Sequence, residues 1–130
     1  MTDPAALIAW LERERRFDFP TKVEGVDVVF HLERPSEVDA MRIQRGELPV
    51  ATHAAYWLGH VRGWTGVVEK CIKGEIVGNN SPVDFSPKLL LAWLVDRRVD
   101  LLADIGEQLH NAAIAHLEQR FATQGNSQPS

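Results

Sequence analysis

Residues 17–34 read FDFPTKVEGVDVVFHLER, and this stretch decides which fold class the chain can adopt. Its second half alternates apolar and polar positions, with the period of two of a half-buried strand. The apolar positions there are Val26, Val28, Phe30 and Leu32. Phe17 to Val23 is a weaker match, and Glu24-Gly25 between the two runs suits a tight turn. We therefore predict a β-hairpin over about residues 17–34, whose apolar face must pack on helices or on another chain.

Helical patterns lie on both sides of this hairpin. Asp3-Pro4 and Ser86-Pro87 each combine a capping residue with proline at the first helical position, and Ser36 can cap a helix in the same way. After Pro49, a helical stripe with spacings of four and three is formed by Val50, Ala54, Trp57, Val61 and Trp64. The predicted helices cover about residues 4–16, 36–45, 50–63, 87–97 and 100–121.

The predicted fold is α+β, a mainly α-helical single domain over residues 1–121 with one β-hairpin near the N-terminus. We expect Val38, Met41 and Ile43 to face inward from the 36–45 helix. Residues 67–85 are rich in turn formers and predict irregular structure, and Asp96-Arg97-Arg98 predicts a break between the last two helices. Residues 122–130 have no apolar anchor and predict a disordered polar tail.

Length and composition exclude several classes of protein. A chain of 130 residues with 45% apolar and 25% charged residues fits one globular domain. The net charge of −4 argues against a nucleic-acid-binding protein. The single cysteine, Cys71, excludes an internal disulfide framework and fits a reducing cytoplasm. Without a basic leader or an apolar run near 20 residues, we expect a soluble intracellular protein that does not enter a membrane.

No group of residues has the spacing of a catalytic or metal site. His53 and His60 share one face of the predicted 50–63 helix but are seven residues apart, whereas paired metal ligands on a helix are usually four apart. His110 and His116, six apart, pair no better. Motifs for a nucleophile elbow, a phosphate loop and a dinucleotide site are missing. We predict a protein that is not an enzyme, with no catalytic residue, metal, cofactor or small-molecule substrate.

Serines and aspartates that could suggest chemistry have structural explanations. The serines lie where a helix cap or a turn needs a hydroxyl, at Ser36, Ser81 and Ser86. Asp96, Asp100 and Asp104 are spaced by four but lie next to Arg97 and Arg98. This pattern is typical of a solvated helix face with ion pairs.

Three segments occur in an order that is more specific than the composition. A strand leads through Glu-Arg-Pro-Ser into a helix (VDVVFHLERPSEVDAMRI, residues 26–43), then comes V-x-G-W-x-G-V (residues 61–67), then SPVDFSPKLL (residues 81–90). Over about residues 22–118 this order resembles the tail assembly chaperones of long-tailed, siphovirus-like bacteriophages and prophages. One departure is the loop GEIVGNN (residues 74–80), which is longer than the turn expected there.

The resemblance implies a protein of phage tail morphogenesis in the cytoplasm of a bacterial host that is absent from the mature virion. Such chaperones bind the tape measure protein, keep it soluble and help to recruit tail tube subunits. Self-association is compatible with this work. The alternative is a phage structural protein, such as a tail completion or connector subunit. A nucleic-acid-binding regulator and a small enzyme are weaker alternatives.

A chaperone of this kind needs an apolar and adaptable contact surface rather than one deep pocket. The chain has four tryptophans, and large aromatic side chains dominate both cores and interfaces. For each tryptophan, packing in the core is the competing interpretation. The protein-binding surface that we predict contains Trp10, Phe17, Phe19, Trp57 and Trp93.

Overall fold

The computed structural model describes residues 2–127 and contains the predicted hairpin. Strands β1 (Arg16–Val23) and β2 (Val26–Glu33) pair antiparallel along their whole length, with Phe19 opposite Phe30. Glu24 and Gly25 join them with φ values of 51° and 75°. Two successive positive φ values give the hairpin turn whose twist matches that of the flanking strands. The α+β class and the hairpin are thus confirmed.

A third strand, β3 (Val61–Thr65), pairs antiparallel with β2 and gives the sheet order β1-β2-β3. The prediction of one helix over residues 50–63 was therefore wrong. The chain instead forms a 3-10 turn η1 (Val50–Thr52), a short helix α3 (Ala54–Leu58) and then this strand. An irregularity in the register between His31 and Leu32 places Val61 opposite Leu32 and Trp64 opposite Phe30. The extra residue makes two inward positions three apart, which imitates helical spacing.

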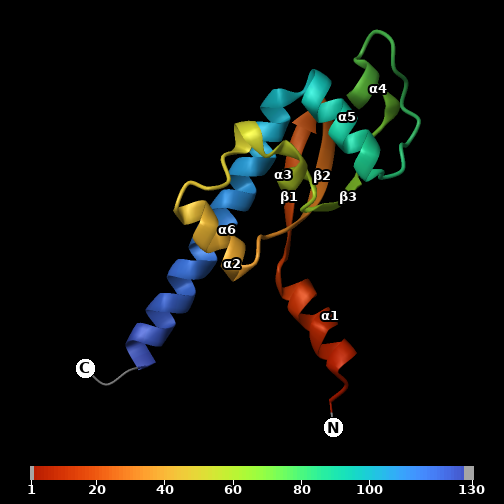
Figure 1. Cartoon of the computed structure of the whole chain (residues 1–130). Coiled ribbons are helices and arrows are strands. Elements are labelled where there is room, and N and C mark those ends of the chain that lie inside the picture. Colours follow the sequence, from red (N-terminus) through yellow and green to blue (C-terminus); the bar gives the residue numbers. More distant parts are fainter. Residues whose placement is uncertain (1, 128–130) are drawn as a thin grey trace.

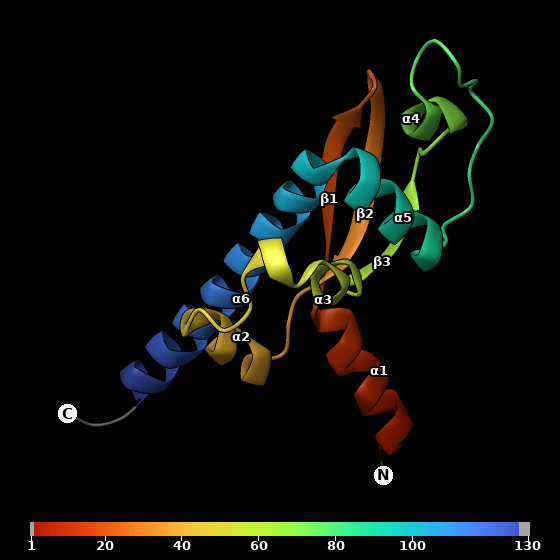
Figure 2. The same ribbon diagram turned by 45° about the horizontal axis from the view of Figure 1, so that its top comes forward.

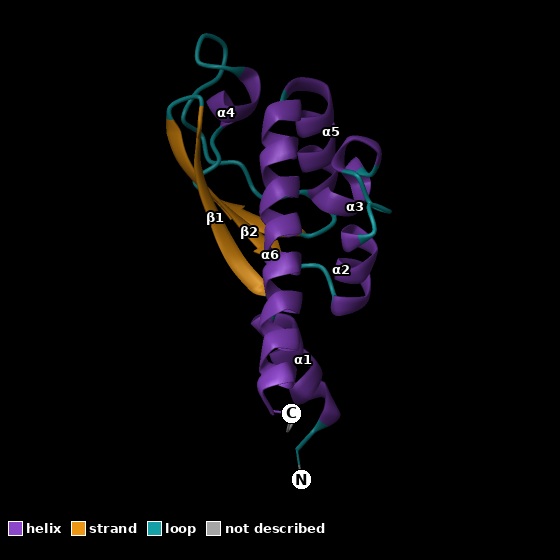
Figure 3. Ribbon diagram, turned by 90° about the vertical axis from the view of Figure 1, so that its left-hand side faces the viewer, coloured by secondary structure: helices purple, strands orange, loops and turns teal. Residues whose placement is uncertain are grey.

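Helix α6 (Val99–Ser127) packs against α2 (Glu37–Gln44), α3 and α5 (Pro87–Arg97), and these helices form a layer beside the sheet (Figure 3). Apolar side chains from both layers form one core. The sheet contributes Val23, Val28, Phe30, Leu32 and Val61. The long helix contributes Leu101, Leu102, Ile105, Leu109, Ala113 and Leu117.

The inward face of α2 agrees with the prediction only at Ile43, which is buried together with Ala40. Val38 and Met41 are instead 71% and 41% exposed. The reason lies on α6, whose His116 and Arg120 bind the carboxylate of Glu37. Residues 37, 40 and 43 share one helix face, so this polar link turns that face toward α6. Ser36 caps the helix as predicted, with its hydroxyl accepting from the amide of Asp39.

The segment over residues 67–85 is more ordered than predicted. It contains helix α4 (Glu69–Lys73), and the amide of Val83 donates to the carbonyl of Val67 over 3.0 Å. The indole of Trp64 donates to the carbonyl of Val83 over 2.7 Å, and its ring contacts Phe85 edge-on with 5.1 Å between centroids. Residues 61–67 and 81–90 are therefore packed against each other.

The ends of the last two helices agree only partly with the sequence prediction. The predicted break occurs at Arg98, where φ is −137° and ψ is 58°. Helix α6 continues to Ser127, inside the segment expected to be a tail, and residues 128–130 lie outside the described part of the chain. Among the helices of residues 2–127, none combines the length and apolar content that crossing a bilayer requires.

Candidate protein-binding site

Helix α1 (Pro4–Glu14) forms as predicted but has no buried residue. Pro4 stands at its first position, and the carboxylate of Asp3 accepts from the amide of Ala5. The helix extends away from the sheet and from the other helices (Figures 1 and 2). Its apolar side chains are 50–57% exposed, namely Leu7, Ile8, Trp10 and Leu11. A contiguous exposed apolar patch is typical of a site that binds another protein.

The C-terminal end of α1 is firmly attached to the sheet. The Nε of Arg15 donates to the carbonyl of Arg34 over 3.0 Å, and the amide of Arg34 donates to the carbonyl of Arg15 over 2.8 Å. A guanidinium nitrogen of Arg15 also lies 3.2 Å from the carboxylate of Glu33. The helix is therefore fixed at one end, while its apolar side chains are left uncovered.

Glu33 is the charged centre of this attachment and is only 5% exposed. Its second oxygen accepts from Nε of Arg62 over 2.6 Å. Burial raises the pKa of Glu33, but the hydrogen bond and charge of Arg62 and the charge of Arg15 outweigh burial and hold the pKa below its ordinary value. The carboxylate is thus ionised and paired at neutral pH.

A second charged cluster joins α2 to the C-terminal half of α6. Glu37 Oε2 lies 2.7 Å from Nε2 of His116 and 3.1 Å from Nε of Arg120. The hydrogen bonds from His116 and Arg120 lower the pKa of Glu37. This cluster fixes the direction in which α6 leaves the core.

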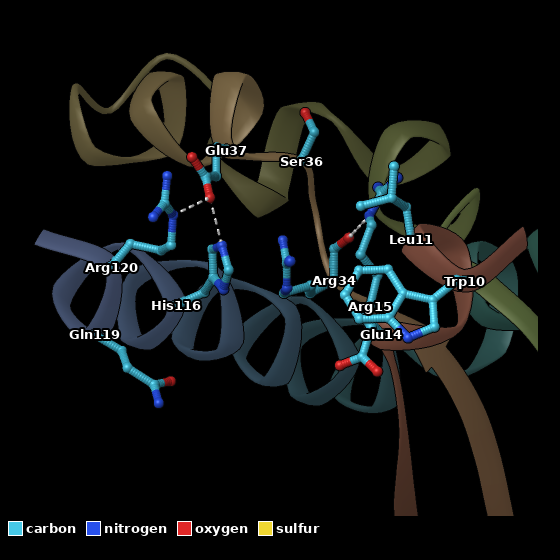
Figure 4. A pocket seen from close by; sticks show the side chains of 10 residues that line it. All are labelled: Trp10, Leu11, Glu14, Arg15, Arg34, Ser36, Glu37, His116, Gln119 and Arg120. Atoms are coloured by element: carbon cyan, nitrogen blue, oxygen red, sulfur yellow. Dashed lines mark hydrogen bonds and ion pairs between the residues drawn. The ribbon is translucent and has the colours of Figure 1, made fainter. Parts of the chain in front are cut away.

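A pocket of about 670 Å³ lies between these two attachments, and we call it the α1–α6 groove (Figure 4). Trp10 and Leu11 line it from α1, and His116 and Arg120 line it from α6. The remaining lining residues are Glu14, Arg15, Arg34, Ser36, Glu37 and Gln119. The groove thus combines an apolar wall with a wall of charged and polar groups.

Arg34 differs from the other cations of the groove. Its guanidinium donates to the carbonyl of Pro35 over 3.1 Å, and no carboxylate among the described residues forms an ion pair with it. Burial and the nearby charge of Arg15 lower the pKa of Arg34, and Glu37 opposes them. A half-buried guanidinium therefore lines the groove with much of its donor capacity unused.

The five aromatic residues predicted to bind a partner do not form one surface. Trp10 lines the groove, while Phe17 and Phe19 lie on the inward face of β1 and are partly buried against the core. Trp57 is fully buried and Trp93 is 3% exposed. For these two tryptophans, core packing is the correct interpretation, so they do not belong to the exposed surface.

The histidines also lie differently from the prediction. His53 precedes α3 and His60 follows it, so they do not share a helix face. Nδ1 of His60 donates to the carbonyl of Tyr56 over 3.0 Å, and burial lowers the pKa of His60. Within the described part of the chain, no three His, Cys, Asp or Glu residues are grouped as metal ligands would be.

A chain of polar side chains crosses the sheet, and no sequence pattern predicted it. His31 Nδ1 lies 2.8 Å from a carboxylate oxygen of Asp18, and its Nε2 lies 2.7 Å from the hydroxyl of Thr65. The order acid, imidazole and hydroxyl matches that of hydrolytic triads. Here each residue comes from a different strand, on the face opposite Phe30, so the chain of hydrogen bonds links all three strands.

Sequence reasoning also missed the polar residues of the groove. These residues come from three distant segments that only the fold brings together, with Arg15 in the first, Arg34 and Glu37 in the second, and His116 and Arg120 in the third. Part of the signal was present, because Glu-Arg-Pro-Ser (residues 33–36) belongs to a segment that carries the resemblance. This segment predicts a helix start, which is correct, but it gives no indication that its residues also line the groove.

Comparisons of the chain with protein families, with curated proteins and with solved structures give no match.

Proposed function

We propose that the chain is a phage or prophage tail assembly chaperone. In the host cytoplasm it binds the tape measure protein and helps to recruit tail tube subunits during tail morphogenesis. The observation that carries this proposal is helix α1, whose large apolar side chains are exposed although its base is fixed to the sheet. A helix with this arrangement leaves an apolar face for another protein.

The nature of the partner follows from the shape of this surface. An amphipathic helix binds by placing its apolar face against an apolar groove or helix. A tape measure protein is long and helical, and it exposes apolar stripes until the tail tube encloses it. The apolar face of α1 suits transient contacts with many such stripes, because single contacts of modest area are weak and their sum is strong.

The resemblance in sequence agrees with the packing of the fold. Its second and third segments lie against each other through the hydrogen bond from Trp64 to Val83 and the contact of Trp64 with Phe85. Their residues therefore have a common structural reason to occur together. Of the motifs that carry the resemblance, the two that meet at Trp64 stabilise the fold by packing against each other. Residues 33–36 lie next to the groove.

The test is co-expression of the chain with the large helical protein encoded just downstream in its genome. We expect the partner to stay in the soluble fraction and to co-purify with the chain, and to aggregate without it. Replacing Leu7, Trp10 and Leu11 by Gln removes the apolar face of α1 while keeping good helix formers. We expect this variant to fold and to lose the complex.

A matched control replaces Val38, Leu91 and Val95 by Gln, since these side chains are exposed apolar residues on α2 and α5. The control variant should keep the complex. Equal loss in both triple variants would place binding elsewhere, and no complex with the unchanged chain would refute the chaperone proposal. Presence of the chain in purified particles would favour the tail completion or connector subunit instead.

A further inference from the structure

Most charges of the α1–α6 groove are paired within the chain, and the two lining residues without an ion pair among the described residues are Arg34 and Glu14. Arg15 pairs with Glu33, and both His116 and Arg120 bind Glu37. Arg34 has no carboxylate partner among the described residues, and the one hydrogen bond recorded from its guanidinium goes to the carbonyl of Pro35. Arg34 is therefore the cation of the groove whose guanidinium is left for a carboxylate from outside the chain.

A guanidinium in this position is suited to a carboxylate. Its planar set of donors matches the two oxygens of a carboxylate, and such a pair is stronger when it is partly shielded from water. Arg34 is half-buried between Arg15 and the β2–α2 connection, so an incoming carboxylate would relieve the repulsion between the two cations. Charge complementarity thus specifies an acidic group on the occupant.

The size and walls of the groove specify the rest of the occupant. A volume of about 670 Å³ accommodates a few side chains rather than a whole folded protein. Trp10 and Leu11 form an apolar wall on α1, and the polar residues of α6 lie on the other side of the groove (Figure 4). An amphipathic helix can present an apolar side chain and a carboxylate one turn apart on neighbouring parts of its surface.

We propose that the α1–α6 groove binds an amphipathic helix of the partner protein that carries an aspartate or glutamate one turn from an apolar residue, and that Arg34 binds this carboxylate. The apolar residue of that helix packs against Trp10 and Leu11. This inference rests on the proposed chaperone function and adds the chemistry by which a segment of the tape measure protein is selected.

The experiment uses synthetic peptides of about 25 residues that tile the downstream-encoded helical protein. Their binding to the full chain is measured by fluorescence anisotropy. We expect every tight-binding peptide to contain an acidic residue one turn from an apolar residue. Arg34→Gln should weaken these peptides by about 10- to 100-fold, and Arg34→Lys should weaken them less because it keeps the charge.

A double-mutant cycle identifies the pair directly. Changing the acidic residue of the peptide to Gln should weaken binding to the unchanged chain as much as Arg34→Gln does, and should add little in the Arg34→Gln background. The matched control is Arg97→Gln on α5, an exposed arginine paired with Asp96, which should leave binding unchanged. Circular dichroism and thermal melting show whether each variant is folded.

The outcomes separate the two proposals. If peptides bind, and the α1 triple variant abolishes binding while Arg34→Gln and the peptide Glu→Gln change have no effect, the carboxylate inference is refuted and the chaperone function stands. If tight-binding peptides lack an acidic residue, the inference is refuted in the same way. If neither the peptides nor the whole partner binds, both proposals are refuted. Self-association that Arg34→Gln disrupts would make a second copy the occupant and would also refute the inference.

Discussion

Helices α1 and α6 have similar amphipathic sequences but opposite surroundings. In α6, the apolar stripe that includes Ile105, Leu109 and Leu117 is 0–1% exposed. In α1, Leu7, Trp10 and Leu11 are 50–57% exposed, and no residue of the helix is buried. The comparison shows that an apolar helical face identifies a surface that needs a neighbour, and that the neighbour can belong to the same chain or to another one.

The largest expected effect is a difference in unfolding free energy between the same kind of substitution in α6 and in α1. Leu109→Ala should lower the free energy of unfolding by about 2–5 kcal/mol, because it removes a fully buried side chain and leaves a cavity. Leu11→Ala, at a side chain that is 57% exposed, should change it by less than about 0.5 kcal/mol. Urea denaturation followed by tryptophan fluorescence measures both.

Equal losses for the two variants would contradict the comparison. They would mean that α1 is covered in solution, by the same chain or by a second copy. Repeating the Leu11→Ala measurement over a range of protein concentrations distinguishes these cases, since only a second copy makes the difference depend on concentration.

A smaller effect tests the attachment of α1 to the sheet. Glu33→Gln should lower the free energy of unfolding by about 1–3 kcal/mol near pH 7, because it weakens the hydrogen bond from Arg62 and removes the ion pair with Arg15. The folded-state pKa of Glu33 lies below its ordinary value of 4.5, so its charged form stabilises the fold above about that pH. This stabilisation is lost as the pH falls through the folded-state pKa.

The difference between the unchanged chain and Glu33→Gln should therefore shrink when unfolding is measured at successively lower pH values. Asp27→Asn is the matched control, because Asp27 is exposed and pairs only loosely with Lys22. A difference that stays constant down to low pH would show that Glu33 does not stabilise the fold through its charge.

The smallest effect tests how closely α6 is packed. Gly106 lies where the turn η1 crosses α6, and a Cβ added there would lie 2.7 Å from Cγ2 of Val50. Gly106→Ala should therefore lower stability by about 1 kcal/mol despite the better helix propensity of alanine. In a Val50→Ala background the same change should become stabilising. If thermal melting shows no such reversal of sign, the close contact between Gly106 and Val50 is contradicted. Helix α1 has no comparable contact.

Sequence patterns predicted the parts of the fold that depend on local chemistry. The hairpin followed from alternation over Val26 to Leu32 and from the Glu24-Gly25 turn. The starts of α1, α2 and α5 followed from Asp3, Ser36 and Ser86, whose side chains all accept from amides of the first turn. Each of these signals acts over a few residues and needs no knowledge of the remaining chain.

The errors arose where two distant segments together determine the result. Val61 and Trp64 had helical spacing because a register shift against β2 places both on the inward face of a strand. Trp57 and Trp93 were assigned to a binding surface, although the helices that carry them bury both. Of the polar residues in the groove, Arg15, Arg34 and His116 come from three distant places in the chain.

The sequence by itself determined the class of the fold, the hairpin, the capped helix starts and the amphipathic character of α1 and α6. These properties depend on backbone conformation and on side-chain spacing, which are local. Only the tertiary structure decided which apolar face is covered, where the third strand pairs and which arginine of the α1–α6 groove lacks a carboxylate partner among the described residues. Burial and ion pairing depend on distances between groups that are remote in the chain, and these distances exist only after folding.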